Sequence, residues 1–219
     1  MAYRYVYIVD QETKKNKKIK VEFTWHSGFS KEQKQKNMIS LHQTFLERFS
    51  NYKILEVSTK SKVDVGVKAS AFNLTIETKK GNTFSVEELF QTSKVYKKNG
   101  DQSHLLKDNV DIREIKRKLR EINENDEMIR YSCFNQDFPL EPRTLFYNWL
   151  YINVLNRNEQ LAKEVLKFDA FTDIEFNPKR SYNCQAEACS IYVSLVRRDL
   201  LEKALNSVEN FKEIVYADV

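Results

Sequence analysis

Apolar and polar residues alternate near the start of the chain. Residues 18–25, KIKVEFTW, place their large apolar side chains on one side of an extended backbone: Ile19, Val21, Phe23 and Trp25. Residues 3–9 alternate more weakly, and the polar stretch QETKKNKK separates the two segments. The pattern predicts a β-hairpin with a basic tip.

A helical spacing of apolar residues follows the hairpin. Ser30 can cap a helix whose apolar positions recur every three or four residues: Met38, Ile39, Leu41, Phe45, Leu46 and Phe49. Neither a low-complexity linker nor an internal repeat divides the rest of the chain. We therefore expect one domain, in which the hairpin and helix of residues 1–50 are an addition to a core of residues 51–219.

The same reasoning assigns elements along the core. Strands are predicted within residues 52–59, after a loop that starts at Ser61, within 171–176 and within 213–218. Helices are predicted from Ser85, where Glu88 completes a capping box, and within residues 111–126, 141–155, 158–168 and 181–207, the last as one helix or two. Residues 97–104 are predicted to be a polar loop.

Composition narrows the fold class. The chain has 219 residues, of which 41% are hydrophobic and 12% aromatic, so it can bury a large core. Only 4 glycines and 3 prolines are present, and tight turns depend on these residues. The composition disfavours a turn-rich sandwich or barrel and predicts a helix-rich α+β fold with a small antiparallel sheet.

The charge permits a polyanionic partner without requiring one. The formal net charge is +5, although 31% of residues are charged and both signs are common. Basic residues gather in two segments, each of which is either a nucleic-acid surface or a solvated face: Lys14, Lys15, Lys17 and Lys18 at the hairpin tip, and Arg113, Lys116, Arg117, Lys118 and Arg120 in the charged helix. Three side chains before the first helix could stack on a base, although burial is the alternative for the first of them: Trp25, His26 and Phe29.

Cysteine and histidine usage argues against a metal site. Cys133, Cys184 and Cys189 form an odd set without a CxxC pair, which suits a reducing compartment. His26, His42 and His104 are scattered, so we expect neither a metal nor another cofactor. The N-terminus lacks a signal-peptide pattern, and the most apolar run, LFYNWLYINVL, is too short to cross a bilayer. These features predict a cytoplasmic protein that does not enter the membrane.

One helical segment, FSVEELFQTSK, combines an acid, an amide and a base on one face. Glu87, Gln91 and Lys94 stand at positions i, i+4 and i+7, while Val86, Leu89 and Phe90 point elsewhere. A solvated helix face with weak surface pairs is the simplest interpretation. A pocket lined by the polar column is the other.

Three motifs in this order resemble the NADAR family, whose members remove ADP-ribose or related ribosyl groups from nitrogen. The first is ILEVSTKSKVDVGVKASAF, which supplies Ser58, Gly66, Ser70 and Phe72, with Ala71 in place of the usual asparagine and Asn73 two residues beyond. The second is SVEELFQTSK, with Glu87, Gln91 and Lys94 in the family spacing and Glu88 in place of a histidine. The third is FDAFTDIEFNPKRSYNCQA, which offers Asp169 or Asp173, Phe171 and Asn183 but no Trp-Gly pair.

The resemblance is closer to a branch of NADAR antitoxins that accompany DarT-type toxins, which ADP-ribosylate DNA. It is carried by GFSKEQKQK, SAFNL, FQTSKVY, FYNWLYI and FTDIEFNP, spread over residues 20–198. The resemblance implies a NADAR-like fold and a glycohydrolase that releases ADP-ribose from guanine in DNA. A flipped or single-stranded base would be the substrate.

The resemblance also implies residue roles. Glu87 would stabilise the positive charge that develops on the sugar when the C–N bond breaks, and Asp173 is a second carboxylate candidate unless it only caps a turn. Gln91 and Asn183 would hydrogen-bond the ribose or the base, and Lys94 with the amides of residues 66–70 would hold the diphosphate. Lys94 pairing with Glu87 is the alternative role.

Two other functions fit the sequence. A non-catalytic antitoxin or nucleic-acid-binding module would explain the basic excess and the departures at Ala71 and Glu88. An N-glycosidase acting on a small ribosyl metabolite would keep the chemistry and change the substrate.

Overall fold

The computed structural model describes residues 2–106 and 110–217. One of its two four-stranded sheets within these residues has the strand order β2-β1-β10-β3 and joins the N-terminal hairpin to strands from the middle and the later part of the chain. The four strands span β1 Ala2–Val9, β2 Asn16–Phe23, β3 Ile54–Glu56 and β10 Ala170–Thr172. β1 pairs with β2 along its whole length, which confirms the predicted hairpin and places it in the same sheet as the core strands.

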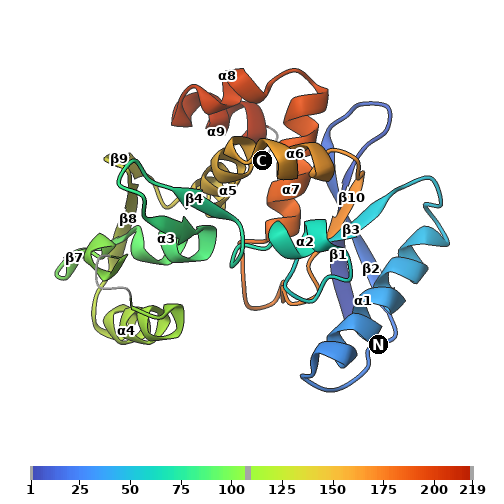
Figure 1. Cartoon of the computed structure of the whole chain (residues 1–219), viewed down its shortest axis with the longest axis horizontal. Helices are drawn as coiled ribbons and strands as arrows, with labels where there is room; N and C mark the ends of the chain where they lie inside the picture. Colours follow the sequence, from blue (N-terminus) through green and yellow to red (C-terminus); the bar gives the residue numbers. More distant parts are fainter. Residues whose placement is uncertain (1, 107–109, 218–219) are drawn as a thin grey trace.

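Helix α1, Lys31–Leu46, covers one face of this sheet (Figure 1). Val6, Ile8 and Phe23 from the hairpin pack against Met38, Leu41 and Phe45 of the helix. Ser30 caps α1 by accepting a hydrogen bond from the backbone N–H of Gln33. The alternation in the hairpin and the helical spacing after it therefore meet in one small core, as the sequence predicts.

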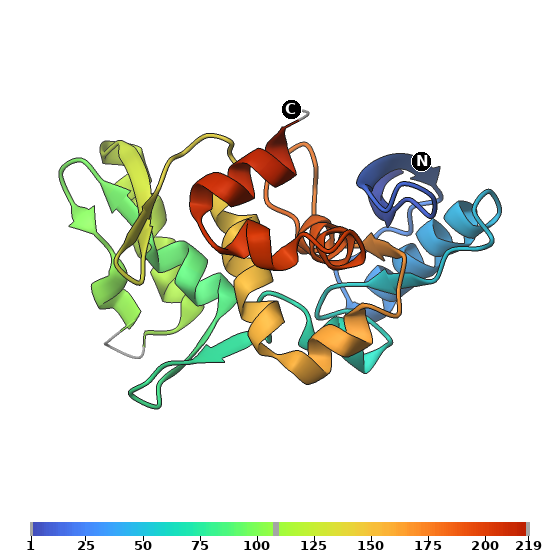
Figure 2. The same ribbon diagram turned by 90° about the horizontal axis from the view of Figure 1, so that it is seen from above.

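Helices α5 and α7 lie between this sheet and a second layer (Figures 1 and 2). α5, Leu145–Arg157, and α7, Gln185–Arg197, are buried along most of their length, which accounts for their nearly continuous apolar sequences. Shorter helices flank them: α6 Glu159–Val165, α8 Leu201–Leu205 and α9 Val208–Tyr216. These elements form the main hydrophobic core.

The second layer is built from strands and helices of the middle of the chain. A sheet of order β7-β6-β8-β9 is antiparallel, and β4 with β5 forms a separate hairpin. These strands span β4 Thr75–Glu77, β5 Thr83–Ser85, β6 Lys94–Tyr96, β7 Gly100–Asp101, β8 Met128–Cys133 and β9 Gln136–Phe138. α3, Val86–Thr92, and α4, Ile112–Asn125, accompany them, and α4 packs through Ile115 and Leu119.

Among the described strands, one parallel pair, β3 with β10, brings polar residues to one edge of this sheet. β10 runs parallel to β3 with Glu56 opposite Thr172, and Asp173 follows immediately. The carboxyl ends of parallel strands are a common place for ligand sites, because the chain leaves the sheet there. Glu56, Thr172 and Asp173 therefore gather at one end of the two strands.

Several predicted elements differ in the structure. The predicted loop after Ser61 contains a short helix, α2 Asp64–Lys68. The predicted polar loop of residues 97–104 contains β7 and the start of a 3-10 helix, Ser103–Leu106. The β8–β9 hairpin was not predicted. α3 ends at Thr92, so Lys94 begins strand β6 rather than extending the helix.

The predicted last strand, residues 213–218, is wrong over its described part. Those residues belong to α9 as far as Tyr216. Ser207 caps this helix, and its buried residues Val208 and Phe211 are three positions apart, which is helical spacing. The β-branched residues of the segment favour a strand locally, but packing against α5 and α8 decides the outcome.

The α+β class is confirmed by this arrangement of helices and sheets. Within residues 2–106 and 110–217, no helix has the length and apolar character needed to traverse a bilayer.

Candidate active site

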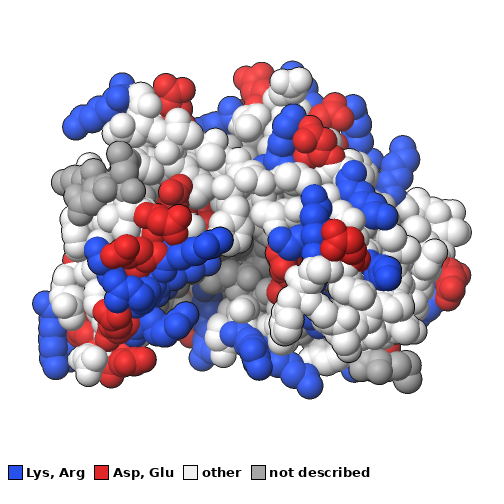
Figure 3. All heavy atoms as spheres, turned by 60° about the horizontal axis from the view of Figure 1, so that its bottom comes forward, with Lys and Arg blue, Asp and Glu red and all other residues white. Residues whose placement is uncertain are grey.

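A cavity of about 440 Å³ lies where α3, the start of α4 and the loop after β10 meet. Its walls carry three acidic side chains, three amides and several rings: Thr59, Ala71, Phe72, Glu87, Phe90, Gln91, Lys116, Tyr147, Asp173, Glu175, Phe176, Ser181, Tyr182, Asn183 and Gln185. Figure 3 shows the surface hollowed in the middle of this face, beside a region where acidic and basic side chains are interspersed.

A capping box fixes the start of α3 and hence the direction of Glu87. The Ser85 hydroxyl accepts a hydrogen bond from the Glu88 N–H, and the Glu88 carboxylate accepts one from the Ser85 N–H at 2.7 Å. The Glu87 N–H donates to the Ala71 carbonyl at 2.9 Å, which ties the first turn to the preceding loop. Glu88 is therefore occupied by the cap, and Glu87 turns into the cavity.

The polar column on α3 is a connected chain of hydrogen bonds. Gln91 Nε2 donates to Glu87 Oε1 at 3.1 Å, and Lys94 Nζ donates to Gln91 Oε1 at 2.7 Å. Burial lowers the pKa of Lys94, and the charge of Glu87 opposes that shift. Lys94 does not line the cavity but holds Gln91 from behind, so the amide presents a fixed donor to Glu87.

Lys116 from α4 closes this wall. Its Nζ lies 2.6 Å from Glu87 Oε1 and 5.0 Å from the centre of the Phe72 ring. The Glu87 side chain is only 12% exposed, whereas that of Lys116 is 37% exposed, so the ammonium sits at the mouth and the carboxylate sits inside. This contact places an ammonium group directly against the Glu87 carboxylate. The predicted alternative partner, Lys94, reaches it only through Gln91.

The loop wall carries the opposite kind of carboxyl group. Asp173 is 8% exposed and accepts hydrogen bonds from the backbone N–H groups of Glu175 and Phe176 at 3.0 and 3.1 Å. Burial raises the pKa of Asp173 well above its ordinary value, although these N–H groups and Gln185 act in the other direction. Asp173 therefore keeps its proton to higher pH than an exposed aspartate.

A second buried acid stands behind Asp173. Glu56 is 2% exposed and accepts hydrogen bonds from the Ser58 and Thr172 hydroxyls, each at 2.6 Å, and from the Ile174 N–H at 2.9 Å. Burial, reinforced by the nearby charge of Asp173, raises the pKa of Glu56. Two neighbouring buried acids cannot both ionise cheaply, which further favours a proton on at least one of them.

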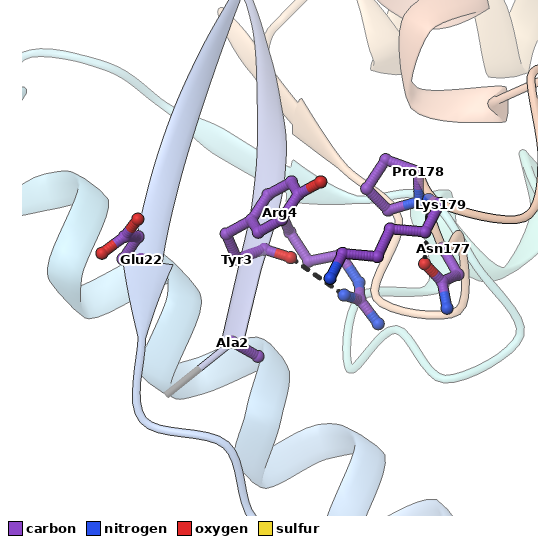
Figure 4. A pocket seen from close by; sticks show the side chains of 7 residues that line it. All are labelled: Ala2, Tyr3, Arg4, Glu22, Asn177, Pro178 and Lys179. Carbon is purple, nitrogen blue, oxygen red and sulfur yellow. Dashed lines mark hydrogen bonds between the residues drawn. The ribbon is translucent and has the colours of Figure 1, made fainter.

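Arg4 is a cation whose charge acts on this buried pair. Burial lowers the pKa of Arg4, and the charges of Asp173 and Glu56 counteract that effect. Its guanidinium donates to the Tyr3 carbonyl at 2.9 Å and reaches a groove beside Asn177 and Lys179 (Figure 4). Arg4 therefore supplies positive charge from outside the cavity wall.

Five of the predicted site residues line the cavity together: Phe72, Glu87, Gln91, Asp173 and Asn183. Asn183 carries a buried carbonyl oxygen, Oδ1, that has no hydrogen-bond partner within the described part of the chain. A buried acceptor without a donor is costly, and a ligand N–H or O–H would satisfy it. Phe72 is 48% exposed and presents its ring at the mouth.

The remaining predicted site residues do not line the cavity, although several support its walls. Ser58 donates to Glu56, and the Ser70 hydroxyl donates to the Val67 carbonyl at 2.8 Å. Gly66 lies so close to the Glu56 backbone that an added Cβ would be 2.0 Å from the Glu56 carbonyl oxygen. Asn73 is exposed and donates to the Val67 carbonyl at 2.9 Å. These residues shape the loop behind Phe72.

Two residues of the third motif point away from the cavity. Phe171 is fully buried in the core. Asp169, at the other end of β10, pairs with Arg197 at 2.9 Å and accepts from the Lys53 N–H. Asp173, two residues after Phe171, is thus the acid of this motif that reaches the site.

Sequence reasoning missed several lining residues. Tyr147 from α5 is buried, and burial raises its pKa far enough to keep its hydroxyl protonated as a donor. Gln185 accepts from the Ala71 N–H at 2.7 Å across 114 positions of sequence. Lys116 appeared only as part of a basic helix. No local spacing marks these residues, because each reaches the cavity through long-range packing.

Comparison with known families adds one finding. A family model described as DarT1-associated NADAR antitoxin matches residues 2–219, nearly the whole chain. No curated protein shows significant similarity to the chain.

Proposed function

The chain belongs to the family of DarT1-associated NADAR antitoxins, and on that premise we propose that it is a glycohydrolase that removes ADP-ribose from guanine in DNA. Its functional counterpart is then a DarT-type toxin that attaches the group. The reaction would reverse the modification and so neutralise the toxin without destroying the DNA.

The observation that carries the proposal is one cavity with two carboxyl groups in opposite environments. Glu87 is paired with Lys116 at 2.6 Å, whereas burial raises the pKa of Asp173. Environments that separate two carboxyl groups in this way are typical of acid and base partners in glycosyl transfer. The pair supplies a negative charge and a transferable proton to one substrate.

The reaction can be written with these two groups alone. The bond between the anomeric carbon and the guanine nitrogen breaks, and its electron pair stays on the nitrogen, which takes a proton from Asp173. Glu87 stabilises the positive charge on the sugar and accepts a proton from the attacking water, whose oxygen bonds to the anomeric carbon. The products are ADP-ribose and unmodified guanine.

The remaining lining residues suit the other parts of ADP-ribose. Lys116 offers a positive charge at the mouth, where a diphosphate could compete with Glu87 for it. The exposed rings of Phe72 and Tyr182, 48% and 63% exposed, provide faces on which a base can stack. Gln91 and Asn183 offer amides to the ribose hydroxyls.

The direct test is hydrolysis of a single-stranded oligonucleotide that carries one ADP-ribosylated guanine. The wild-type chain is expected to release ADP-ribose, and Glu87→Gln is expected to reduce the rate by about 10³-fold, since the amide keeps the size but loses the charge. Glu88→Gln is the matched control on the same helix. It should retain near wild-type activity, because glutamine also serves in a capping box.

Three outcomes would contradict the proposal. Equal activity of Glu87→Gln and wild type would remove Glu87 from the chemistry. Neutralisation of the toxin by Glu87→Gln as complete as by wild type, with binding to the toxin in a pull-down, would favour a non-catalytic antitoxin. Faster hydrolysis of a small ribosyl metabolite than of the oligonucleotide would assign the enzyme to a different substrate.

A further inference from the structure

A second cavity adjoins the candidate active site across the loop of residues 176–182. It has a volume of about 450 Å³ and shares Phe176, Ser181 and Tyr182 with the first cavity. Its other walls come from β1, from the segment before α5, from α7 and from α9. We call it the flanking pocket. Tyr182 lines both cavities, so an extended ligand with one end in the first cavity can reach the flanking pocket by passing this residue.

Aromatic rings and cations line the flanking pocket together. Lys18 Nζ lies 5.4 Å from the centre of the Tyr5 ring, and the Arg143 guanidinium lies 4.5 Å from the centre of the Tyr182 ring. Tyr7 continues the row of rings along β1, with its centroid 6.3 Å from that of Tyr5. Flat rings beside cations match the two parts of a nucleotide, because bases stack on the rings and phosphates pair with the cations.

One acidic side chain gives the flanking pocket a hydrogen-bond acceptor. Glu187, in the first turn of α7, lines the pocket and is only partly exposed. Burial raises the pKa of Glu187 to about 7, while Lys18 and Asn148 oppose the shift. A carboxyl group at this depth can accept hydrogen bonds from the amino group of a base.

The distribution of ion pairs favours this side of the molecule over α4 for contact with a polyanion. On α4, Arg117 lies 2.7 Å from Glu121, and Lys118 lies 3.6 Å from Glu114, so their charges are largely compensated. Lys18 and Lys179 lie over tyrosine rings, and neither forms an ion pair within the described residues.

The basic surface continues beyond the flanking pocket along β1. Figure 4 shows the adjoining groove, into which Arg4 and Lys179 point beside Tyr3. Strand β1 extends past the end of β10, which pairs only with Tyr7 and Ile8, so this part of its edge is open to the groove. Phosphates on either side of a base in the flanking pocket would therefore meet the positive charges of Lys18 and Lys179, while Arg143 shares its charge with Glu141 at 3.1 Å.

We propose that the flanking pocket binds the nucleotide next to the modified guanine in single-stranded DNA, with its base against the tyrosine rings and its phosphates near Lys18 and Arg143. The inference rests on the proposed function, since it assumes that the modified guanine occupies the cavity of Glu87. A duplex could not present a neighbouring base to this pocket without unstacking it.

Binding of an unmodified eight-nucleotide single strand tests the inference without depending on hydrolysis. Fluorescence anisotropy of a labelled strand would compare wild type with the double variant Lys18→Ala/Arg143→Ala. Arg117→Ala/Lys118→Ala on α4 is the control, because it removes the same charge. The first variant should weaken binding roughly tenfold and flatten the salt dependence, whereas the control should change it less than twofold.

A second arm locates the base. Two strands are compared with the intact strand, one with an abasic nucleotide before the guanine and one with it after the guanine. One of the two should bind wild type several-fold more weakly than the intact strand does, and this difference should vanish in Lys18→Ala/Arg143→Ala. Melting curves of both variants are expected to match that of wild type, since Lys18, Arg143 and Arg117 are exposed and Lys118 is half-buried.

Three results would overturn the inference: equal losses in the α4 control, no effect of either abasic position, or binding of duplex as tight as that of the single strand. Failure of the proposed function is a separate result. It would appear as normal strand binding without any release of ADP-ribose from the modified oligonucleotide.

Discussion

The two walls of the candidate active site hold their carboxyl groups in contrasting ways. On α3, Glu87 is the end of a side-chain network, with Gln91 at 3.1 Å and Lys116 at 2.6 Å. On the loop after β10, Asp173 is held by the backbone N–H groups of Glu175 and Phe176, at 3.0 and 3.1 Å, and has Glu56 behind it. One wall stabilises negative charge with a cation, and the other suppresses it by burial.

This contrast teaches that position along the cavity decides the role of each acid. A cation at the mouth pairs with the Glu87 carboxylate where the sugar would develop positive charge. Removal from water keeps a proton on Asp173 where a leaving base would need one. If Glu87 were buried and Asp173 were paired with a cation, neither acid would suit its proposed role, even though both carboxyl groups would remain.

The largest effect is expected when both walls lose their acids. Combining Glu87→Gln with Asp173→Asn should reduce the hydrolysis rate by about 10⁴-fold, less than the product of the single losses, because both groups act on one transition state. Single-turnover release of ADP-ribose measures this. Strictly multiplicative losses would show that the two walls act in separate steps.

Removing the proton donor alone should have a smaller effect that depends on pH. Asp173→Asn is expected to lower the rate by about 10²-fold at neutral pH. Because Asp173 acts in its protonated form, wild-type activity should fall as the pH rises through its raised pKa, and the variant should lose this decline. The measurement is the hydrolysis rate of both proteins between pH 5 and 9. A variant whose pH–rate profile has the same shape as that of wild type would exclude Asp173 as the acid.

Removing the cation at the mouth should affect binding more than chemistry. Lys116→Ala is expected to raise KM roughly tenfold by removing a phosphate partner, with a smaller change in kcat. Lys118→Ala on the same helix is the control, because Lys118 lies 3.6 Å from Glu114 and does not line the cavity. A KM equal to that of the control would mean that Lys116 serves Glu87 alone.

The smallest effect concerns stability on the loop wall. The folded state raises the pKa of both Glu56 and Asp173, so it binds their protons more tightly than the unfolded chain does. This contribution is full below the ordinary carboxyl range and is lost as the pH rises through the folded-state values.

We therefore expect the melting temperature to fall by a few degrees between pH 5 and 8 from this source. Glu56→Gln cannot ionise, so its melting temperature should depend less on pH over the same range. Calorimetry at four pH values compares the two proteins. A steeper dependence in the variant would contradict the assignment of the proton to this pair.

The two walls also differ in how far the sequence predicts them. Glu87 and Gln91 were predicted together because i, i+4 spacing on a capped helix is a local property, and Ser85 with Glu88 marks the cap. Lys94 was predicted to lie on the same helix but is the first residue of β6. No local sequence feature shows that α3 ends as early as Thr92. Its contact with Gln91 survives because the chain continues directly into β6.

The loop wall depends on contacts that no spacing reveals. Asp173 approaches Glu56 because β10 and β3 pair in parallel, and Gln185 reaches Ala71 across 114 positions. Ser58 and Gly66 come from a motif of the resemblance, yet they pack around Glu56 rather than facing the cavity. Such residues support the site through tertiary structure, which a single sequence does not specify.

The charge state of Asp173 tests the central claim most directly. Carboxyl carbon NMR of protein labelled at aspartate, assigned with Asp173→Asn, can follow this group as the pH is raised. The account predicts that Asp173 remains protonated well above the ordinary aspartate value of 3.8 while the protein stays folded. A resonance already shifted to that of a carboxylate at pH 5 would contradict it.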